Sequence, residues 1–98
     1  MLLFTHPAML AHEPPPGHAE RPARLAAVLK GLEPLGAHRR EAPLAGKAAI
    51  ARVHSLPYIE ALETAFAESA AAMVQLDADT FLSPGSREAA YRAAGAVV

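Results

Sequence analysis

A proline-rich stretch divides the first third of the sequence into pieces that cannot belong to one element. "HEPPPGHAERPARL", His12 to Leu25, contains four prolines and a glycine. Proline fixes its backbone φ angle and has no N–H to donate, so it interrupts strands and helix interiors but suits the first turn of a helix. The sequence therefore predicts a buried strand at Leu2–Thr5, a loop over residues 6–20 and a helix that begins at Pro22.

The helix after this loop has a clear apolar stripe. Leu25, Val28, Leu29 and Leu32 recur at the spacing of one helical face. Pro34 prevents the helix from continuing far beyond them.

The remainder of the chain alternates between short extended pieces and helices. Residues 37–43 are compatible with a polar second strand, and residues 45–54 with a brief helix. Ser55 is a good cap for a helix over residues 55–69. The apolar face expected for that helix consists of Tyr58, Leu62, Ala65 and Phe66.

The last third predicts an extended piece and a final helix. Residues 73–81 are strand-like and run into a loop at residues 77–83. Ser83 is the expected cap of the final helix, with Pro84 at its first position and Glu88 near its positive end. Strands alternating with helices favour an α/β fold.

The helical pattern of "YRAAGAVV" reaches Val98 with no stop signal. We therefore expect residues 1–98 to be the N-terminal part of a single domain, with further strands downstream and no second domain.

Composition excludes several classes of function. The net charge is −1 and no basic block is present, which argues against nucleic-acid binding. The chain has no cysteine, so disulfides and cysteine-based zinc sites are excluded, and a reducing cytoplasm is the expected compartment. No signal peptide or apolar run of membrane-spanning length is present. Alanine supplies 24 residues, so other side chains must provide most of the core.

Two arginines stand at the start of the predicted helix. Arg21 is a poor capping residue, and both Arg21 and Arg24 face the positive end of the helix dipole. Two explanations remain open. Glu13, Glu20 or another carboxylate forms an ordinary ion pair with them, or one arginine faces a buried or bound anion.

The histidines are weaker candidates for chemistry. His12 and His18 are six residues apart and lack the companions of a tetrahedral zinc site, so we expect them to be loop residues. A metal-binding module that uses His12, His18 and Asp77 is a minor alternative. His54, at a junction between two helices, is expected to be structural.

Asp77 and Asp79 form a D-x-D pair. In an extended segment their side chains point the same way and can hold a metal ion. Turn formation explains aspartates at these positions equally well.

Three segments, taken in order, resemble the N-terminal part of the histone deacetylase superfamily, and most of all its bacterial acetoin-utilisation deacetylases and acetylpolyamine amidohydrolases. "PPGHAERPARL" resembles the signature G-H-P-E-R-P-x-R-[LI], with Ala19 where proline is common. "ARVHSLPYIEAL" resembles V-H-[ST]-x-x-Y-[IV]-x-x-L, and "LDADTFLSPGS" resembles D-x-D-T-x-x-[ST]-P-G-S.

The resemblance implies an open parallel-sheet α/β fold shared with arginases. It implies a zinc-dependent amidohydrolase that removes acetyl groups from acetyl-lysine or acetylated amines by the attack of a zinc-bound water. The family's zinc ligands, its catalytic histidine pair and its tyrosine are expected downstream. The resemblance therefore assigns no catalytic or metal-binding residue to this segment and predicts that the segment alone is inactive.

The resemblance also implies roles for three residues. Arg24 matches an arginine at the base of the internal channel below the metal, which favours the acetate product. Asp79 matches an acid at the active-site rim that accepts hydrogen bonds from the substrate backbone. His12 belongs to the first rim loop, which shapes substrate access. The alternative to a deacetylase is a non-catalytic α/β module that binds a partner or forms a homo-oligomer through an unpaired sheet edge.

Overall fold

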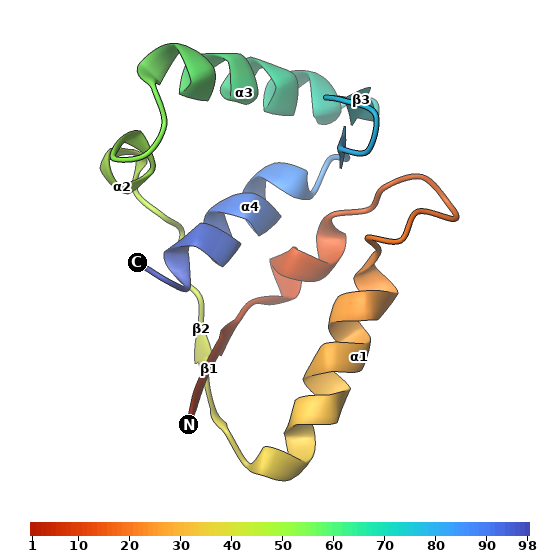
Figure 1. Cartoon of the computed structure of the whole chain (residues 1–98), viewed down its shortest axis with the longest axis vertical. Coiled ribbons are helices and arrows are strands. Elements are labelled where there is room, and N and C mark those ends of the chain that lie inside the picture. The colour runs from red at the N-terminus through yellow and green to blue at the C-terminus, as the bar shows by residue number, and fades with distance from the viewer.

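A computed structural model describes all 98 residues (Figure 1). Helices and short strands alternate along the chain, as expected for the α/β class. In chain order the elements are β1 (Leu2–Thr5), η1 (Pro7–Ala11), α1 (Pro22–Leu32), η2 (Glu33–Leu35), β2 (His38–Glu41), α2 (Lys47–Ala51), α3 (Leu56–Ser69), β3 (Val74–Gln75), β4 (Phe81–Leu82) and α4 (Ser86–Gly95), where η marks a 3-10 helix. None of these helices has both the length and the apolar character needed to cross a bilayer.

The first two strands form a parallel pair, with Leu2 opposite His38 and Thr5 opposite Glu41. The connection between them contains α1, so this part of the chain is a β-α-β unit. The strand at Leu2–Thr5 was predicted correctly, but its burial was not. Leu2 is 57% exposed and Phe4 is 40% exposed, because the sheet is only two strands wide and β1 packs mainly on β2.

The expected loop over residues 6–20 begins with a short helix that the sequence analysis missed. Nδ1 of His6 accepts a hydrogen bond from the N–H of Ala8 at 3.0 Å, which caps η1. Pro7 occupies its first turn, where proline is tolerated. The local signal was therefore present, since a capping side chain directly precedes a proline.

Two predicted helix starts are confirmed. α1 begins at Pro22 and gives way to η2 before Pro34, and the backbone turns at Gly36 with a φ of 61°. α3 begins after Ser55, whose hydroxyl accepts a hydrogen bond from the N–H of Tyr58 at 3.3 Å.

The buried face of α3 is partly the one predicted, because Phe66 is buried but Tyr58 is not. Ile59, Phe66 and Ser69 are its buried residues, whereas Tyr58 is 51% exposed. Tyr58 instead stacks on the ring of His54, at 5.1 Å between ring centres, which is consistent with a structural role for His54.

The prediction for residues 73–83 is only partly correct. β3 and β4 form an antiparallel hairpin, with Val74 opposite Leu82, where we expected one extended piece and a loop. Ser83 does not cap the final helix, because its hydroxyl accepts from the N–H of Glu13 and donates to the carbonyl of Ala11. α4 begins at Ser86 with Gly85 as its capping residue, and Pro84 lies in the preceding turn.

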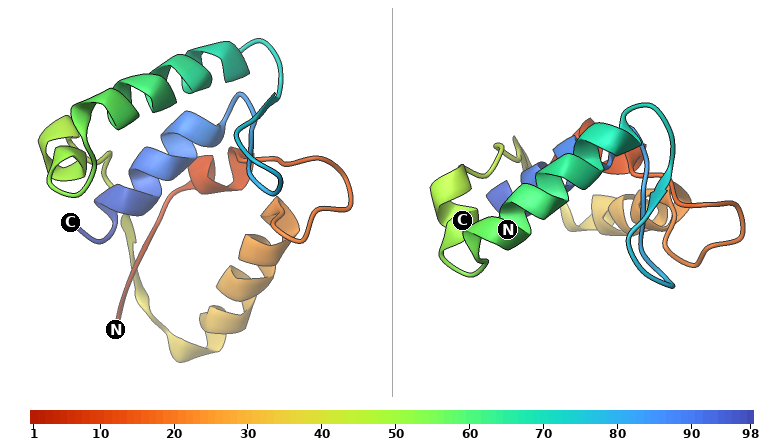
Figure 2. Two further views of the ribbon diagram at one scale, coloured as in Figure 1. Left: turned by 45° about the horizontal axis from the view of Figure 1, so that its top comes forward. Right: turned by 90° about the horizontal axis from the view of Figure 1, so that it is seen from above.

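α4 is the central element of this packing (Figures 1 and 2). It lies between α3 on one side and η1 on the other. Two glycines allow the close approach of its ends. A Cβ atom on Gly85 would lie 2.4 Å from the carbonyl oxygen of Ala11, and one on Gly95 would lie 1.8 Å from that of Pro43.

An ion pair joins α3 to α4. The hydroxyl of Tyr91 donates to Oε1 of Glu63 at 2.6 Å, and Arg87 bonds the same carboxylate at 3.0 Å. The hydrogen bond from Tyr91, together with Arg87, lowers the pKa of Glu63. The same hydrogen bond to Glu63 raises the pKa of the Tyr91 phenol.

Candidate functional site

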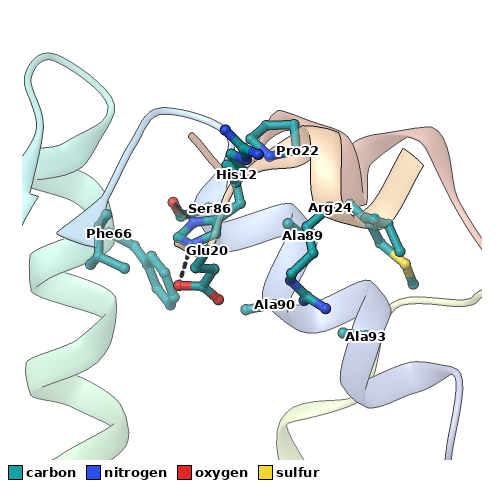
Figure 3. Close-up of a pocket in the computed structure, with 13 residues that line it drawn as sticks. His12, Glu20, Pro22, Arg24, Phe66, Ser86, Ala89, Ala90 and Ala93 are labelled. Atoms are coloured by element: carbon teal, nitrogen blue, oxygen red, sulfur yellow. Dashed lines mark hydrogen bonds and ion pairs between the residues drawn. The ribbon is translucent and has the colours of Figure 1, made fainter. Parts of the chain in front are cut away.

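A pocket of about 380 Å³ lies where α1, η1 and α4 meet (Figure 3). Its polar residues come from the proline-rich loop and from the starts of the two helices, and its other walls are mostly apolar. The lining residues are Met9, His12, Glu20, Arg21, Pro22, Arg24, Leu25, Phe66, Leu82, Ser86, Ala89, Ala90 and Ala93.

The two arginines at the start of α1 have no counter-ion. Arg21 occupies the capping position without a side-chain hydrogen bond to the helix. Neither Arg21 nor Arg24 belongs to a salt bridge or a side-chain hydrogen bond in the chain, and no acidic residue occupies the first turn of α1. The ion pair expected with Glu13 or Glu20 is therefore absent. In Figure 3 the side chain of Arg24 extends into the space between α1 and α4.

Glu20 pairs with His12 and not with an arginine. Nε2 of His12 lies 3.5 Å from Oε2 of Glu20, and Nδ1 lies 2.6 Å from the hydroxyl oxygen of Ser86 (Figure 3). His12 thus links the proline-rich loop to the first residue of α4. The structure places His12 and Arg24, both singled out from the sequence, on the same pocket.

A serine cluster fixes η1 against α4, and the sequence analysis missed it. The N–H of Glu13 donates to Oγ of Ser83 at 2.9 Å, and the Ser83 hydroxyl donates to the carbonyl of Ala11 at 3.3 Å. The N–H of Ser83 donates to Oγ of Ser86 at 2.7 Å. No buried side-chain polar atom of the chain lacks a partner. The "SPGS" motif carried the signal, but it was interpreted only as a helix start.

Asp79 does not line the pocket. It lies in the turn between β3 and β4, is exposed, and has no hydrogen bond or ion pair to its carboxylate. His18 of the proline-rich loop contacts its backbone, so the hairpin turn adjoins the same loop that carries His12.

Asp77 and Asp79 both lie in the turn between β3 and β4. Oδ1 of Asp77 accepts the N–H of Asp79 at 2.9 Å, which makes a turn and not an extended segment. Hydrogen bonds from the Asp79 N–H and the Thr80 hydroxyl lower the pKa of Asp77. The extended segment that would align the two carboxylates is not formed, and turn formation, the other explanation left open by the sequence, accounts for Asp77.

The residues of this chain do not form a zinc site. No three His, Asp or Glu side chains gather closely enough to hold a metal ion. His12 bonds Ser86 and Glu20, and His18 bonds Asp79, so the grouping of His12, His18 and Asp77 does not occur.

The pocket has the chemistry of a small-anion site. An arginine guanidinium can bind a carboxylate through two parallel hydrogen bonds. Arg24 is exposed and offers an unpaired guanidinium at a pocket that is also lined by Phe66 and three alanines. A carboxylate with a short apolar group would match both features.

Comparisons with known proteins identify the family to which the chain belongs. The model of the histone deacetylase domain matches residues 18–98. The crystal structure of the HDA15 HD domain is similar to this chain, with a TM-score of 0.83 and 25% sequence identity. That similarity covers 97% of this chain and 29% of the solved one, so the chain spans less than a third of the domain that it resembles. A search of curated proteins finds no match. The match to the family model covers most of the residues that build the pocket and the hairpin, and the chain belongs to the histone deacetylase family.

Proposed function

We propose that residues 1–98 form the N-terminal part of the single catalytic domain of a zinc-dependent deacetylase. The reaction is the hydrolysis of an acetyl amide to acetate and a free amine. Family membership supports a deacetylase in general terms. The observation that carries the proposal is the guanidinium of Arg24, which has no counter-ion in a pocket with mostly apolar walls.

In this proposal Arg24 receives the acetate product at the base of the internal channel. Acetate has one carboxylate and one methyl group, which fit a guanidinium and an apolar wall respectively. His12 holds the rim loop through Ser86, and Asp79 presents its free carboxylate to donors on the substrate. These three residues bind and position, and none of them performs the bond-breaking step.

The zinc ion and its ligands belong outside these residues. The side chains present do not fit a metal site, so no chemical step is assigned to them. The family pattern places one histidine and two aspartates downstream as ligands, together with the histidine pair. When bound, zinc would activate the attacking water.

The substrate is proposed to be acetyl-lysine or an acetylated small amine. The motifs favour the bacterial branch of deacetylases, which includes acetylpolyamine amidohydrolases. We propose a cytoplasmic enzyme that binds neither nucleic acid nor membrane, a proposal that the net charge of −1 and the lack of a basic block support.

Acetate release by the intact protein tests the proposal. With zinc present, we expect acetate from an acetyl-lysine peptide or from an acetylated polyamine, and we expect a chelator to stop it. Arg24→Gln should lower turnover, whereas Arg52→Gln should not, because Arg52 lies outside the pocket. The 98-residue chain alone should release none. If the zinc-loaded intact protein releases acetate from neither substrate, the proposal is wrong.

One observation favours the alternative of an interaction module. Leu2 and Phe4 of β1 and Leu56 of α3 are large apolar residues that are at least 40% exposed. Exposed apolar surface promotes association. Light scattering on the 98-residue chain distinguishes the two ideas when combined with the acetate assay. A defined oligomer together with an inactive intact protein would favour the module.

A further inference from the structure

The backbone of Asp79 is held from both sides. Its N–H donates to Oδ1 of Asp77 at 2.9 Å, and its carbonyl oxygen lies 2.8 Å from Nε2 of His18. His18 and Asp79 are 61 positions apart in the sequence. The bond therefore joins two separate segments, the proline-rich loop and the β3–β4 turn, which lie side by side in Figures 1 and 2.

The other ring nitrogen of His18 determines the direction of this bond. Nδ1 of His18 lies 3.1 Å from the backbone nitrogen of Glu20, whose N–H can only donate. Nδ1 is therefore the acceptor, and the neutral ring carries its proton on Nε2. That proton is donated to the carbonyl oxygen of Asp79. The ring also packs edge-on against Phe81, with 5.7 Å between ring centres, which limits its rotation.

The side chain of Asp79 is left free by this arrangement. Its carboxylate has no partner in the chain, although both of its backbone polar groups are bonded. A carboxylate that must accept hydrogen bonds from a substrate benefits from a fixed backbone, because less freedom is lost on binding. The carboxylate of Asp77 is not equivalent, since it is occupied by the turn.

We propose that His18 is a positioning residue, which orients the Asp79 carboxylate toward backbone N–H donors of the substrate. The inference rests on the proposed deacetylase function and adds a residue to it. His18 touches no substrate in this scheme. It acts through the carbonyl of Asp79.

Two substitutions at His18 separate positioning from loop structure. The amide nitrogen of glutamine can take the place of Nε2, so His18→Gln keeps the donor to Asp79. The amide of asparagine is shorter and can take the place of Nδ1. His18→Asn therefore keeps an acceptor for the Glu20 N–H but loses the bond to Asp79.

The experiment uses the intact zinc-loaded enzyme and two peptides. One is an acetyl-lysine peptide, and the other is the same peptide with the amide nitrogens that flank acetyl-lysine methylated. For the first peptide, we expect His18→Asn and Asp79→Ala each to lower kcat/KM about tenfold, equivalent to one lost hydrogen bond of about 1.4 kcal/mol. The double variant should lose little more than either single one, because both remove the same contact. His18→Gln should stay close to wild type.

The methylated peptide is the control, because it cannot donate to Asp79. On it, we expect His18→Asn to match wild type. An equal loss on both peptides would overturn the inference and would indicate a general loosening of the loop. An unchanged kcat/KM of His18→Asn on the first peptide would also overturn it. If the wild type releases acetate from neither the unmethylated peptide nor an acetylated polyamine, the proposed function fails, and the inference fails with it.

Discussion

Two helices begin at the same pocket and do so in opposite ways. At the start of α4, the Ser83 N–H donates to the Ser86 hydroxyl, the Ser83 hydroxyl donates to the carbonyl of Ala11, and Ser86 also bonds His12. Glu88 lies in the first turn, where a negative charge suits the helix dipole. At the start of α1, Arg21 caps nothing and Arg24 has no counter-ion. Both helix starts line one cavity.

The difference between the two helix starts separates residues that stabilise the fold from residues that are available to bind a ligand. The hydroxyls of Ser83 and Ser86 at the α4 start are bonded within the chain, so they hold η1 and the rim loop in place. The α1 start instead costs about 0.3–1 kcal/mol for each cation at the positive helix end. A cost that no contact within the chain offsets is expected where a ligand provides the missing charge.

The largest effect is expected from Gly85→Ala. The new Cβ atom would lie 2.4 Å from the backbone oxygen of Ala11, and a backbone atom cannot move aside as a flexible side chain can. We expect the free energy of unfolding of the intact protein to fall by about 3 kcal/mol, measured by urea denaturation.

Gly31→Ala is the matched control. A Cβ atom there meets nothing within 4 Å, and Gly31 lies inside α1. Alanine should raise the free energy of unfolding by about 0.5–1 kcal/mol. If Gly85→Ala and Gly31→Ala change the free energy of unfolding by the same amount, the backbone of η1 does not lie as close to Gly85 as described.

Ser86→Ala should have the next largest effect. It removes the acceptor of the buried Ser83 N–H and the partner of His12. An unsatisfied buried group costs about 1–3 kcal/mol, so we expect a loss of about 2 kcal/mol in the same assay. Thr64→Ala removes an exposed hydroxyl and should change stability by less than about 0.5 kcal/mol. A loss for Ser86→Ala as small as that of the control would show that the serine cluster does not stabilise the α4 start.

Arg24→Gln should act in the opposite direction. Removing an unpaired cation from the positive end of α1 is expected to stabilise the intact protein by about 0.5 kcal/mol in the absence of acetate. Thermal unfolding at low salt, where screening is weakest, is the measurement. A clear loss of stability would mean that Arg24 has a structural partner, and the contrast between the two helix starts would disappear.

Much of the fold could be predicted because its signals are local. Pro22 and Ser55 mark helix starts through their own backbone and side-chain chemistry, and the apolar run at Leu2–Thr5 marks a strand. The misassigned start of α4 depends on distant partners. Ser83 bonds the backbone of Glu13, 70 positions away, so no rule based on neighbouring residues could place its hydroxyl.

The candidate site was predictable to a smaller extent. The misplaced charges of Arg21 and Arg24 followed from the helix dipole, and the absence of a counter-ion came only from the structure. Pairing between Glu20 and His12 was not foreseen, because both residues lie in a loop whose path the sequence does not determine. The roles of Arg24, Asp79 and His12 come from family resemblance and stay predictions.

Product inhibition by acetate tests most directly whether the α1 start is kept free for an anion. In the intact enzyme, acetate should inhibit the wild type and the Arg52→Gln control equally. Its inhibition constant should rise about tenfold or more in Arg24→Gln, the effect of losing hydrogen bonds to a charged group. An inhibition constant that is the same in the wild type and in Arg24→Gln would contradict the assignment of Arg24 to the acetate product.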